Sequence, residues 1–252
     1  MNGIVFYPAG SSPALTYATQ RLQERGCNIA DTPSKAVTHL LLPVPSFDGG
    51  EIRGGGKLDT LLETLPETVT VVGGNLQHPL LENYSTIDLL QNPTYLAENA
   101  AITADCALLI ARSRLPVVLS GCSVLVLGWG RIGKCLAQML KAVGAEVTVA
   151  ARKETDLAMI QALGYRAEQI GALHYGLIRY RLIFNTAPTV VLKESQLKHC
   201  QTDCVKIDLA SGIGIEGDDV IRARGLPGKD APESSGLLIA KTVMCLTAGR
   251  EC

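Results

Sequence analysis

An apolar strand that runs straight into a glycine-rich turn constrains the fold of this chain more than any other feature. Residues 123–127 are Ser-Val-Leu-Val-Leu, and Gly128-Trp-Gly-Arg-Ile-Gly133 follows at once. A helical pattern then continues to Val143, breaks at Gly144, and is followed by a second apolar segment at 146–150. A lone G-x-G-x-x-G is a weak signal. Between a strand and a helix, with a second strand behind it, the motif predicts a dinucleotide-binding βαβ unit.

Each glycine of this motif has its own physical reason. Gly128 permits the tight turn, Gly130 lets the backbone approach a pyrophosphate, and Gly133 allows the helix to pack closely on the strand. The helix N-terminus adds free N–H donors and the positive end of its dipole. Arg131 is either a further phosphate contact or a solvated surface side chain. The cofactor-binding turn is therefore assigned to Gly128, Trp129, Gly130, Arg131, Ile132 and Gly133.

The end of the second strand sets the expected choice of dinucleotide. NAD enzymes usually place an Asp or Glu there, which binds the ribose 2′-hydroxyl. This chain has Ala150-Ala151-Arg152-Lys153 instead, so two cations stand at the tip. The sequence favours NADP, whose 2′-phosphate Arg152 and Lys153 would bind. Because Glu154 and Asp156 follow closely, NAD stays open as the alternative.

Further apolar segments predict further strands of the same sheet, at 165–167, 182–185, 205–209 and 220–223. Two segments rich in small residues end strands on the same edge of the sheet, and the carboxyl ends of parallel strands line the ligand crevice. Asn185, Thr186 and Ser211 offer hydrogen bonds there. We therefore expect both segments to flank the nicotinamide half of the cofactor, although each would be an ordinary turn by itself. The residues concerned are Thr186, Ala187, Pro188, Leu209, Ala210 and Ser211.

The first half of the chain shows the same alternation of short apolar runs and helical patterns. Strands are expected at 3–7, 27–30, 38–43 and 68–72, and helices at 15–25 and 57–65. This rhythm predicts a small parallel sheet. The glycine-rich stretch 45–56 follows a strand and is expected to be a loop, either in contact with a ligand or as a plain connector.

An Ala-rich helix expected from about Thr94 to Arg112 separates the two halves. Small residues let such a helix pack closely on two neighbours, as an interdomain linker must. The predicted fold class is α/β, with two doubly wound parallel-sheet domains. Residues 1–115 form the N-terminal domain for substrate or partner, and 116–252 form a Rossmann domain that binds NAD(P).

Composition excludes several classes of protein. The 252 residues carry 23 basic and 24 acidic side chains, a net charge of −1, so no nucleic-acid partner is expected. No signal peptide and no apolar run of membrane-spanning length is visible, which favours a cytoplasmic protein without a membrane partner. The eight cysteines form no C-x-x-C pair, so reduced thiols and no metal site are expected. Hydrolase and kinase motifs are missing.

A set of short motifs carries a family resemblance. They are Ala97–Ala104, Leu127–Gly133, Val149–Arg152, Asn185–Pro188, Asp208–Ser211 and Gly225–Pro232, the last followed by Ser234-Ser-Gly236. The last run is the most distinctive, because Rossmann dehydrogenases in general do not carry it. With these motifs the chain resembles the dipicolinate synthase A chain family of spore-forming bacteria, from about Tyr95 to Val243 and more weakly before that.

The resemblance implies an activity and a setting. The activity is NAD(P)-linked oxidation of dihydrodipicolinate, or of 4-hydroxy-tetrahydrodipicolinate, to dipicolinate during sporulation. The implied substrate is thus a small pyridine dicarboxylate precursor. The implied partner is a flavoprotein-like B subunit in the mother-cell cytoplasm, and a homo-oligomer stays open.

No residue stands out as a catalytic acid or base. Lys229 is the first candidate for a clamp on a substrate carboxylate, with a surface lysine as the alternative. Asn99 and Thr103 lie four residues apart on one helical face and are either substrate contacts or polar positions in a helix seam. His78 is kept as a candidate for proton transfer. Two alternative functions stay open: an NADP-linked reductase of another imino or keto acid, and a non-catalytic nucleotide-binding regulatory subunit.

Overall fold

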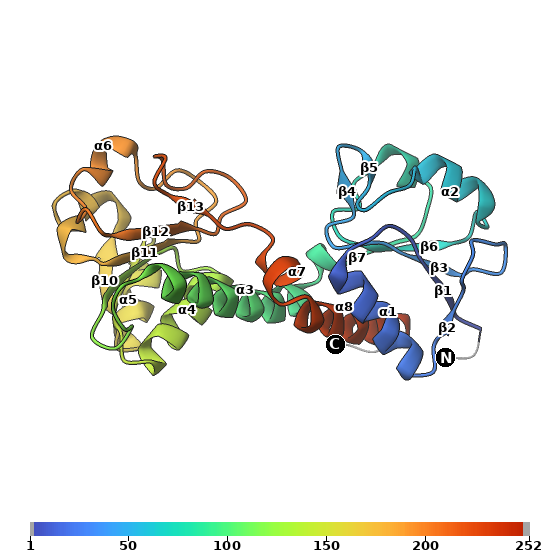
Figure 1. Ribbon diagram of the computed structural model, residues 1–252, viewed down its shortest axis with the longest axis horizontal. Coiled ribbons are helices and arrows are strands. Elements are labelled where there is room, and N and C mark those ends of the chain that lie inside the picture. Colours follow the sequence, from blue (N-terminus) through green and yellow to red (C-terminus); the bar gives the residue numbers. More distant parts are fainter. Residues whose placement is uncertain (1–2, 249–252) are drawn as a thin grey trace. The chain divides into compact units, whose positions relative to one another are not determined.

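The computed structural model describes residues 3–248, except for the side chains of His174 and Tyr175. The chain divides into two compact units, one formed by Met1–Asn99 with Pro227–Cys252 and the other by Ala100–Leu226. We refer to them as unit 1 and unit 2. Each contains a parallel sheet with helices packed against it (Figure 1). The expected fold class, two doubly wound parallel-sheet α/β domains, is confirmed.

Unit 1 holds a five-stranded sheet in the order β2-β1-β3-β6-β7, with all neighbouring strands parallel. The strands are β1 (Val5–Pro8), β2 (Asn28–Ile29), β3 (His39–Leu41), β6 (Thr70–Gly73) and β7 (Thr86–Asp88). From β1 the chain passes through helix α1 (Pro13–Glu24) to β2 on one side of β1. It then returns to β3 on the other side. The strand order therefore reverses between β1 and β3.

The glycine-rich stretch 45–56 contains more structure than the expected loop. It forms an antiparallel hairpin of β4 (Phe47–Asp48) and β5 (Glu51–Ile52), with Gly49 and Gly50 at positive φ in the turn. Ile52 is buried in the core of unit 1, and Phe47 packs against the same core. These two apolar side chains anchor the hairpin, which glycine content alone does not reveal. The same core also buries Leu58 and Leu62 of α2 (Leu58–Thr64).

The C-terminal helix α8 (Pro232–Thr247) packs beside α1 within unit 1 (Figure 1). A Cβ atom on Gly236 would lie 2.5 Å from Tyr17 Cβ and 2.6 Å from the Ala14 carbonyl oxygen. Glycine at this position is therefore what allows the two helices to approach so closely. It also gives the distinctive Ser-Ser-Gly run a structural role.

The observed division differs from the boundary expected between residues 115 and 116. The long helix α3 (Pro93–Arg114) begins in unit 1 and continues in unit 2, and residues 227–252 return to unit 1 instead of completing the Rossmann domain. The return is explained by α8, whose buried Leu238, Ile239 and Val243 form an apolar face that needs a partner. An ion pair of 2.6 Å between Lys241 and Glu98 joins the same helix to the start of α3.

Unit 2 holds a six-stranded parallel sheet in the order β10-β9-β8-β11-β12-β13, the strand order of a Rossmann domain. The strands are β8 (Ser123–Leu127), β9 (Glu146–Ala151), β10 (Arg166–Gln169), β11 (Leu182–Asn185), β12 (Val205–Asp208) and β13 (Ile221–Arg222). The order reverses between β8 and β11. Every residue of β11 is buried, as expected for a central strand covered on both faces.

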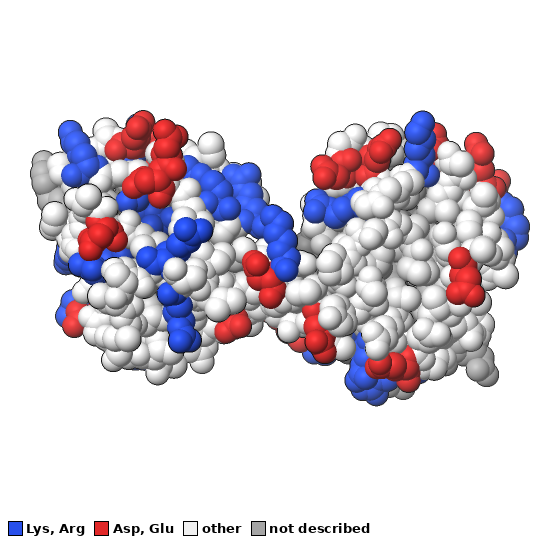
Figure 2. All heavy atoms as spheres, in the orientation of Figure 1, with Lys and Arg blue, Asp and Glu red and all other residues white. Residues whose placement is uncertain are grey.

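Helices and short turns complete unit 2. They are α4 (Arg131–Ala142), α5 (Glu154–Ala162), η3 (Ile170–Tyr175), η4 (Leu177–Arg179), α6 (Glu194–Leu197) and α7 (Leu226–Asp230), the last of which crosses into unit 1. Among the described residues no helix is long and apolar enough to cross a membrane. Basic and acidic side chains occur together on each unit (Figure 2).

The cysteines of the described part, seven in number, form no disulfide with one another, while Cys252 lies outside the described residues. Cys106 and Cys122 are buried, and Cys135 is half-buried. Within the same part of the chain no group of three His, Cys, Asp or Glu side chains is placed to hold a metal ion.

Replacing Gly236 by Ala tests the close contact between α1 and α8. The added methyl group would meet backbone atoms that cannot move aside, so we expect a loss of about 1–3 kcal/mol of unfolding free energy. Ser234→Ala, two residues earlier and exposed, is the matched control and should change stability by no more than about 0.5 kcal/mol. Urea unfolding measures both. Equal stability of the two variants would contradict the role given to Gly236.

Candidate nucleotide site

Unit 2 has a pocket of about 350 Å³ at the point where its strand order reverses. Its walls are the turn after β8 (128–130), the end of β9 (151–153), Asp156 of α5, Ile170 of η3 and the turn after β11 (186–188). Open α/β sheets bind ligands in the crevice outside the carboxyl ends of their strands, at such a switch point. The turn after β8 and the segment 186–188 are thereby brought together as the sequence predicts.

The glycines of the first turn separate into two kinds. Gly128 has a φ of +105°, and a Cβ atom there would lie 2.6 Å from Thr186 Oγ1. A Cβ atom on Gly133 would overlap the Gly128 carbonyl oxygen. Both glycines are therefore required by the packing of the protein itself. A Cβ atom on Gly130, in contrast, would meet nothing within 4 Å. Gly130 thus leaves open the space that a pyrophosphate needs.

The start of α4 is suited to an anion. The helix begins at Arg131, its N-cap Gly130 has no side chain to occupy the free N–H groups, and its first turn has no acidic residue. These N–H groups lack intrahelical partners, and the helix dipole is positive at this end. Arg131 is exposed and Ile132 half-buried beside them. The residues present therefore fit a dinucleotide whose pyrophosphate faces the N-terminus of α4.

The end of the pocket at the tip of β9 carries both signs of charge. Arg152 and Lys153 are exposed at the tip of β9, and the Arg152 carbonyl oxygen accepts a hydrogen bond of 3.2 Å from Gln169 Nε2. Asp156 also lines the pocket, from the first turn of α5. Its place in the wall follows from the helix start at Glu154, which puts Asp156 in the first turn, next to the strand tip.

Trp129 is fixed against the wall of the pocket. Its ring meets Tyr165 edge-on with 6.0 Å between centroids, and Lys134 Nζ lies 5.7 Å from the Trp129 ring centre. The indole Nε1 is buried and has no hydrogen-bond partner among the described residues. Since a buried donor normally has a partner, the pocket wall retains unused hydrogen-bonding capacity.

A buried carboxylate holds the segments behind the pocket. Asp208, at the end of β12, is 1% exposed. Its two oxygens accept five hydrogen bonds, from Asn185 Nδ2 (2.7 Å), Ala210 N–H (3.1 Å), Gly214 N–H (2.8 Å), Ile215 N–H (3.1 Å) and Arg222 Nη1 (2.7 Å). One side chain therefore joins β11, β13 and the whole loop that follows β12.

Asn185 connects Asp208 to the pocket wall through hydrogen bonds. It is fully buried at the end of β11, and its Nδ2 donates to the Ala187 carbonyl oxygen at 3.0 Å. The Ala187 N–H donates in turn to Asn185 Oδ1 at 3.1 Å. Thr186 is held separately, because its Oγ1 donates to the Leu127 carbonyl oxygen at 3.0 Å. The turn 186–188 is thus fixed to two strands and, through Asn185, to Asp208.

The same contacts keep Asp208 ionised. Burial acts to raise the pKa of the carboxyl, but the hydrogen bonds from Asn185 and from the backbone of Gly214, Ile215 and Ala210 outweigh it, so the pKa is lowered. Asp208 is therefore a carboxylate at neutral pH whose oxygens are all engaged. It organises the site and has no proton to give.

The predicted residues Leu209, Ala210 and Ser211 do not line the pocket. Leu209 and Ala210 are buried behind it, where the Ala210 N–H binds Asp208, and Ser211 is exposed. The sequence pattern correctly places these residues at a strand end. It does not show that the carboxylate of Asp208 draws their backbone inward.

The candidates for substrate binding and proton transfer lie elsewhere. Lys229 is exposed on α7, within unit 1. His78 is also in unit 1, where its Nδ1 accepts a 3.2 Å hydrogen bond from the Leu80 N–H and its ring lies 4.9 Å from that of Phe47. Asn99 is half-buried and Thr103 is buried on α3. None of these four described residues lines the nucleotide pocket.

Comparison with known proteins places this geometry in context. Residues 107–224 match the NAD-binding domain of the D-isomer specific 2-hydroxyacid dehydrogenases. Over 248 residues the chain is 25% identical to the A subunit of dipicolinate synthase from Bacillus subtilis (strain 168), and the match spans 88% of this chain and 82% of that protein. The resemblance to the dipicolinate synthase A chain family is confirmed. The expectation of an NAD(P)-dependent oxidoreductase is confirmed with it.

Solved structures share the fold. The A subunit of dipicolinate synthase from Bacillus halodurans superimposes with a TM-score of 0.86 at 23% identity, covering 98% of each chain. An L-alanine dehydrogenase gives a TM-score of 0.67 at 15% identity, covering 97% of this chain and 81% of that one. The fold of this chain and that of the Bacillus halodurans subunit therefore match over nearly the whole length of both chains.

Gly130→Val tests the turn after β8. The φ of −79° suits valine and a Cβ atom there meets nothing within 4 Å, so stability should change by no more than about 0.5 kcal/mol. Binding of NADPH should nevertheless weaken at least about tenfold, because the side chain fills the space beside the free N–H groups. Quenching of Trp129, the single tryptophan of the chain, reports binding. Gly228→Val, which is equally open but lies in unit 1, should bind normally; unchanged binding by Gly130→Val would contradict this assignment.

Asp208→Asn tests the buried carboxylate. We expect a loss of about 3 kcal/mol at neutral pH, because Arg222 and the backbone N–H groups lose their anionic partner. The folded pKa of Asp208 is depressed, so its stabilising effect is present above the unfolded value of about 4 and disappears as pH falls through the folded value. The stability difference should therefore shrink in acid. Asp203→Asn, which weakens the ion pair between exposed Asp203 and half-buried Arg181, should cost less than about 1 kcal/mol. A difference that did not depend on pH would contradict this account.

Proposed function

We propose that this chain is the dehydrogenase subunit of a dipicolinate synthase, which oxidises dihydrodipicolinate or 4-hydroxy-tetrahydrodipicolinate to dipicolinate during sporulation. The observation that carries the proposal is the identity to the Bacillus subtilis protein along 88% of the chain. The nucleotide pocket of unit 2 supports it, because such an oxidation requires a hydride acceptor.

The chemistry asks little of the protein. Dihydrodipicolinate loses one hydride and one proton to become the aromatic product, and the hydroxylated precursor loses a water molecule first. A bound nicotinamide supplies the hydride acceptor, and the protein positions it. Aromatisation is itself downhill, so a strong general base is unnecessary. This agrees with a site whose one buried carboxylate, Asp208, is engaged on both oxygens.

The roles of the site residues follow from their places. The turn from Gly128 to Gly133 binds the pyrophosphate, and Thr186–Pro188 flank the nicotinamide, with Leu209–Ser211 behind them. Lys229, Asn99 and Thr103 remain candidates for contacts with the substrate, and His78 remains a candidate for proton transfer. Each of these roles belongs to the proposal.

We propose NADP as the preferred cofactor. Arg152 and Lys153 stand at the strand tip that meets the ribose, and the planar guanidinium of Arg152 suits a phosphate. Asp156 is the single carboxylate among the residues that line the pocket, so two cations outweigh it. The net positive charge favours a 2′-phosphate over a 2′-hydroxyl.

Arg152→Ala tests the preference. In the unaltered protein NADPH should bind at least about tenfold more tightly than NADH, which corresponds to about 1.4 kcal/mol, and the variant should lose that difference. The matched control is Arg166→Ala, an exposed arginine of β10 whose partner is Glu146 at 3.7 Å. Titration followed by Trp129 fluorescence gives all the affinities. Equal binding of NADPH and NADH by the unaltered protein would refute the NADP preference.

We further propose that the partner is a flavoprotein-like B subunit and that the location is the mother-cell cytoplasm. The name of the relative, which calls it a subunit, supports an assembly. Co-purification from sporulating cells, compared with vegetative cells, tests both points.

Turnover decides between the candidate functions. Freshly prepared dihydrodipicolinate and NADP⁺ should give dipicolinate and NADPH in equal amounts, with or without the partner, and Gly130→Val should abolish the reaction. The match to 2-hydroxyacid dehydrogenases favours one competitor, reduction of an imino or keto acid. Activity with those acids alone would establish the competitor. Dinucleotide binding without any turnover, even with the partner, would indicate a regulatory subunit.

A further inference from the structure

Unit 1 has its own switch point, between β1 and β3, and the segments that follow these two strands meet there. The Ser11 N–H donates to the Arg53 carbonyl oxygen at 3.0 Å. A Cβ atom on Gly10 would lie 2.5 Å from that same oxygen, and one on Gly54 would overlap the backbone of Ser11. The two segments are therefore in backbone contact, and Arg53 lies at their junction.

The backbone of Arg53 is also held from the other side. Its N–H donates to the Ser46 carbonyl oxygen at 2.9 Å. Ser46 is fully buried, and its hydroxyl accepts from the Gly74 N–H at 3.0 Å and donates to the Pro43 carbonyl oxygen at 2.9 Å. The segments after β1, β3 and β6 are thus joined into one platform at the carboxyl edge of the sheet, and Arg53 is part of it.

The side chain of Arg53 lacks the partners that its burial calls for. It is half-buried, its Nε is buried without a hydrogen bond, and no carboxylate lies within 4.0 Å of it in the part of the chain that the structure describes. Asp48 and Glu51 of the neighbouring hairpin are exposed. Buried arginine N–H groups are normally paired with an anion or a carbonyl group.

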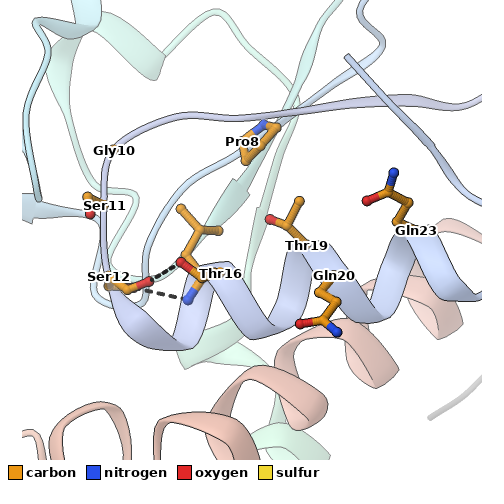
Figure 3. Close-up of a pocket in the computed structure, with 9 residues that line it drawn as sticks. Pro8, Gly10, Ser11, Ser12, Thr16, Thr19, Gln20 and Gln23 are labelled. Atoms are coloured by element: carbon orange, nitrogen blue, oxygen red, sulfur yellow. Dashed lines mark hydrogen bonds between the residues drawn. The ribbon is translucent and has the colours of Figure 1, made fainter. Parts of the chain in front are cut away.

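A pocket of about 380 Å³ opens beside this junction. Gly10, Ser11 and Ser12 form one end of it, and α1 forms one side, from which Thr19 projects toward Pro8 (Figure 3). The Thr16 hydroxyl donates to the Ser12 carbonyl oxygen at 3.3 Å. The lining residues carry hydroxyl and amide groups but no formal charge. Arg53 does not line the pocket itself and adjoins it through the backbone contact with Ser11. Thr19 Oγ1 is a second buried polar atom without a partner among the described residues. The volume is within the range of small-molecule sites.

We propose that Arg53, with the pocket beside Ser11, is a carboxylate-binding site of unit 1 that takes a carboxylate of the substrate. The assignment of the ligand to the substrate rests on the proposed function, since a pyridine dicarboxylate precursor has two carboxylates to bind. The planar guanidinium of Arg53 pairs with carboxylate oxygens, and the Ser11 and Thr19 hydroxyls donate the remaining hydrogen bonds. In this proposal the glycine-rich stretch 45–56 contacts the ligand through Arg53. Glycine is needed at position 54 because a side chain there would prevent the contact with Ser11.

Calorimetric titration of the full chain tests the site with two probes, pyridine-2,6-dicarboxylate and the aliphatic dicarboxylate glutarate. Arg53→Gln should weaken binding of pyridine-2,6-dicarboxylate at least about tenfold, or about 1.4 kcal/mol, and Arg53→Lys should weaken it less. Arg25→Gln, an exposed arginine of the same unit, is the matched control and should bind as the unaltered protein does. Affinity for NADPH should be the same in all four proteins.

The outcomes separate this inference from the proposed function. Equal binding of pyridine-2,6-dicarboxylate by Arg53→Gln and the unaltered protein overturns the role of Arg53 and leaves the function standing. Binding of glutarate alone, dependent on Arg53, supports the carboxylate site and refutes the proposed substrate. Binding of neither probe by the unaltered protein overturns the site.

Chemical labelling covers the case in which Arg53→Gln fails to fold. Phenylglyoxal modifies accessible arginines, and peptide mass spectrometry gives the extent of modification of each. Pyridine-2,6-dicarboxylate should protect Arg53 and leave Arg25 equally reactive in the unaltered protein. Unchanged labelling of Arg53 in the presence of a bound dicarboxylate would overturn the inference.

Discussion

The reversal of strand order beside the first strand of each sheet is the constraint on which both sites depend. All strands within a unit's main sheet run parallel, so their carboxyl ends meet at one edge, and the connections leave the central pair in opposite directions. The loops after β8 and β11 separate in unit 2, and those after β1 and β3 do so in unit 1. Each sheet therefore offers an edge where backbone N–H groups and loop side chains surround a small pocket.

Asp208 and Arg53 are charged residues at these two edges, and they differ in whether the protein supplies partners for the charge. Asp208 is surrounded by donors, so its charge is compensated within the protein and fixes the loops behind the nucleotide pocket. Arg53 has its backbone bound on both sides, while its side chain keeps a buried donor without a partner. A compensated charge contributes to structure, whereas an uncompensated one is available to a ligand. This difference separates the organising role of Asp208 from the binding role proposed for Arg53.

Glycines occur where the backbone closely approaches a neighbour, and the structure shows whether that neighbour is another part of the protein or open space. Gly133 and Gly236 face protein backbone, at the turn after β8 and at the contact between α1 and α8. Gly130 faces open space, which in the proposed function the pyrophosphate of the dinucleotide occupies. The sequence shows all three as glycines and cannot tell these cases apart, because the deciding neighbour is distant in the chain.

The sequence by itself determined the strands of unit 2, the dinucleotide turn and the parallel α/β class, because apolar periodicity and glycine spacing are local properties of the chain. Only the tertiary structure decided that 227–252 return to unit 1, where α1 covers the apolar face of α8. The same holds for the hairpin at 47–52, which two apolar side chains anchor in a core built by other segments. The hydrogen bond between Asn185 and Asp208 and the contact between Arg53 and Ser11 likewise join residues that are distant in the chain.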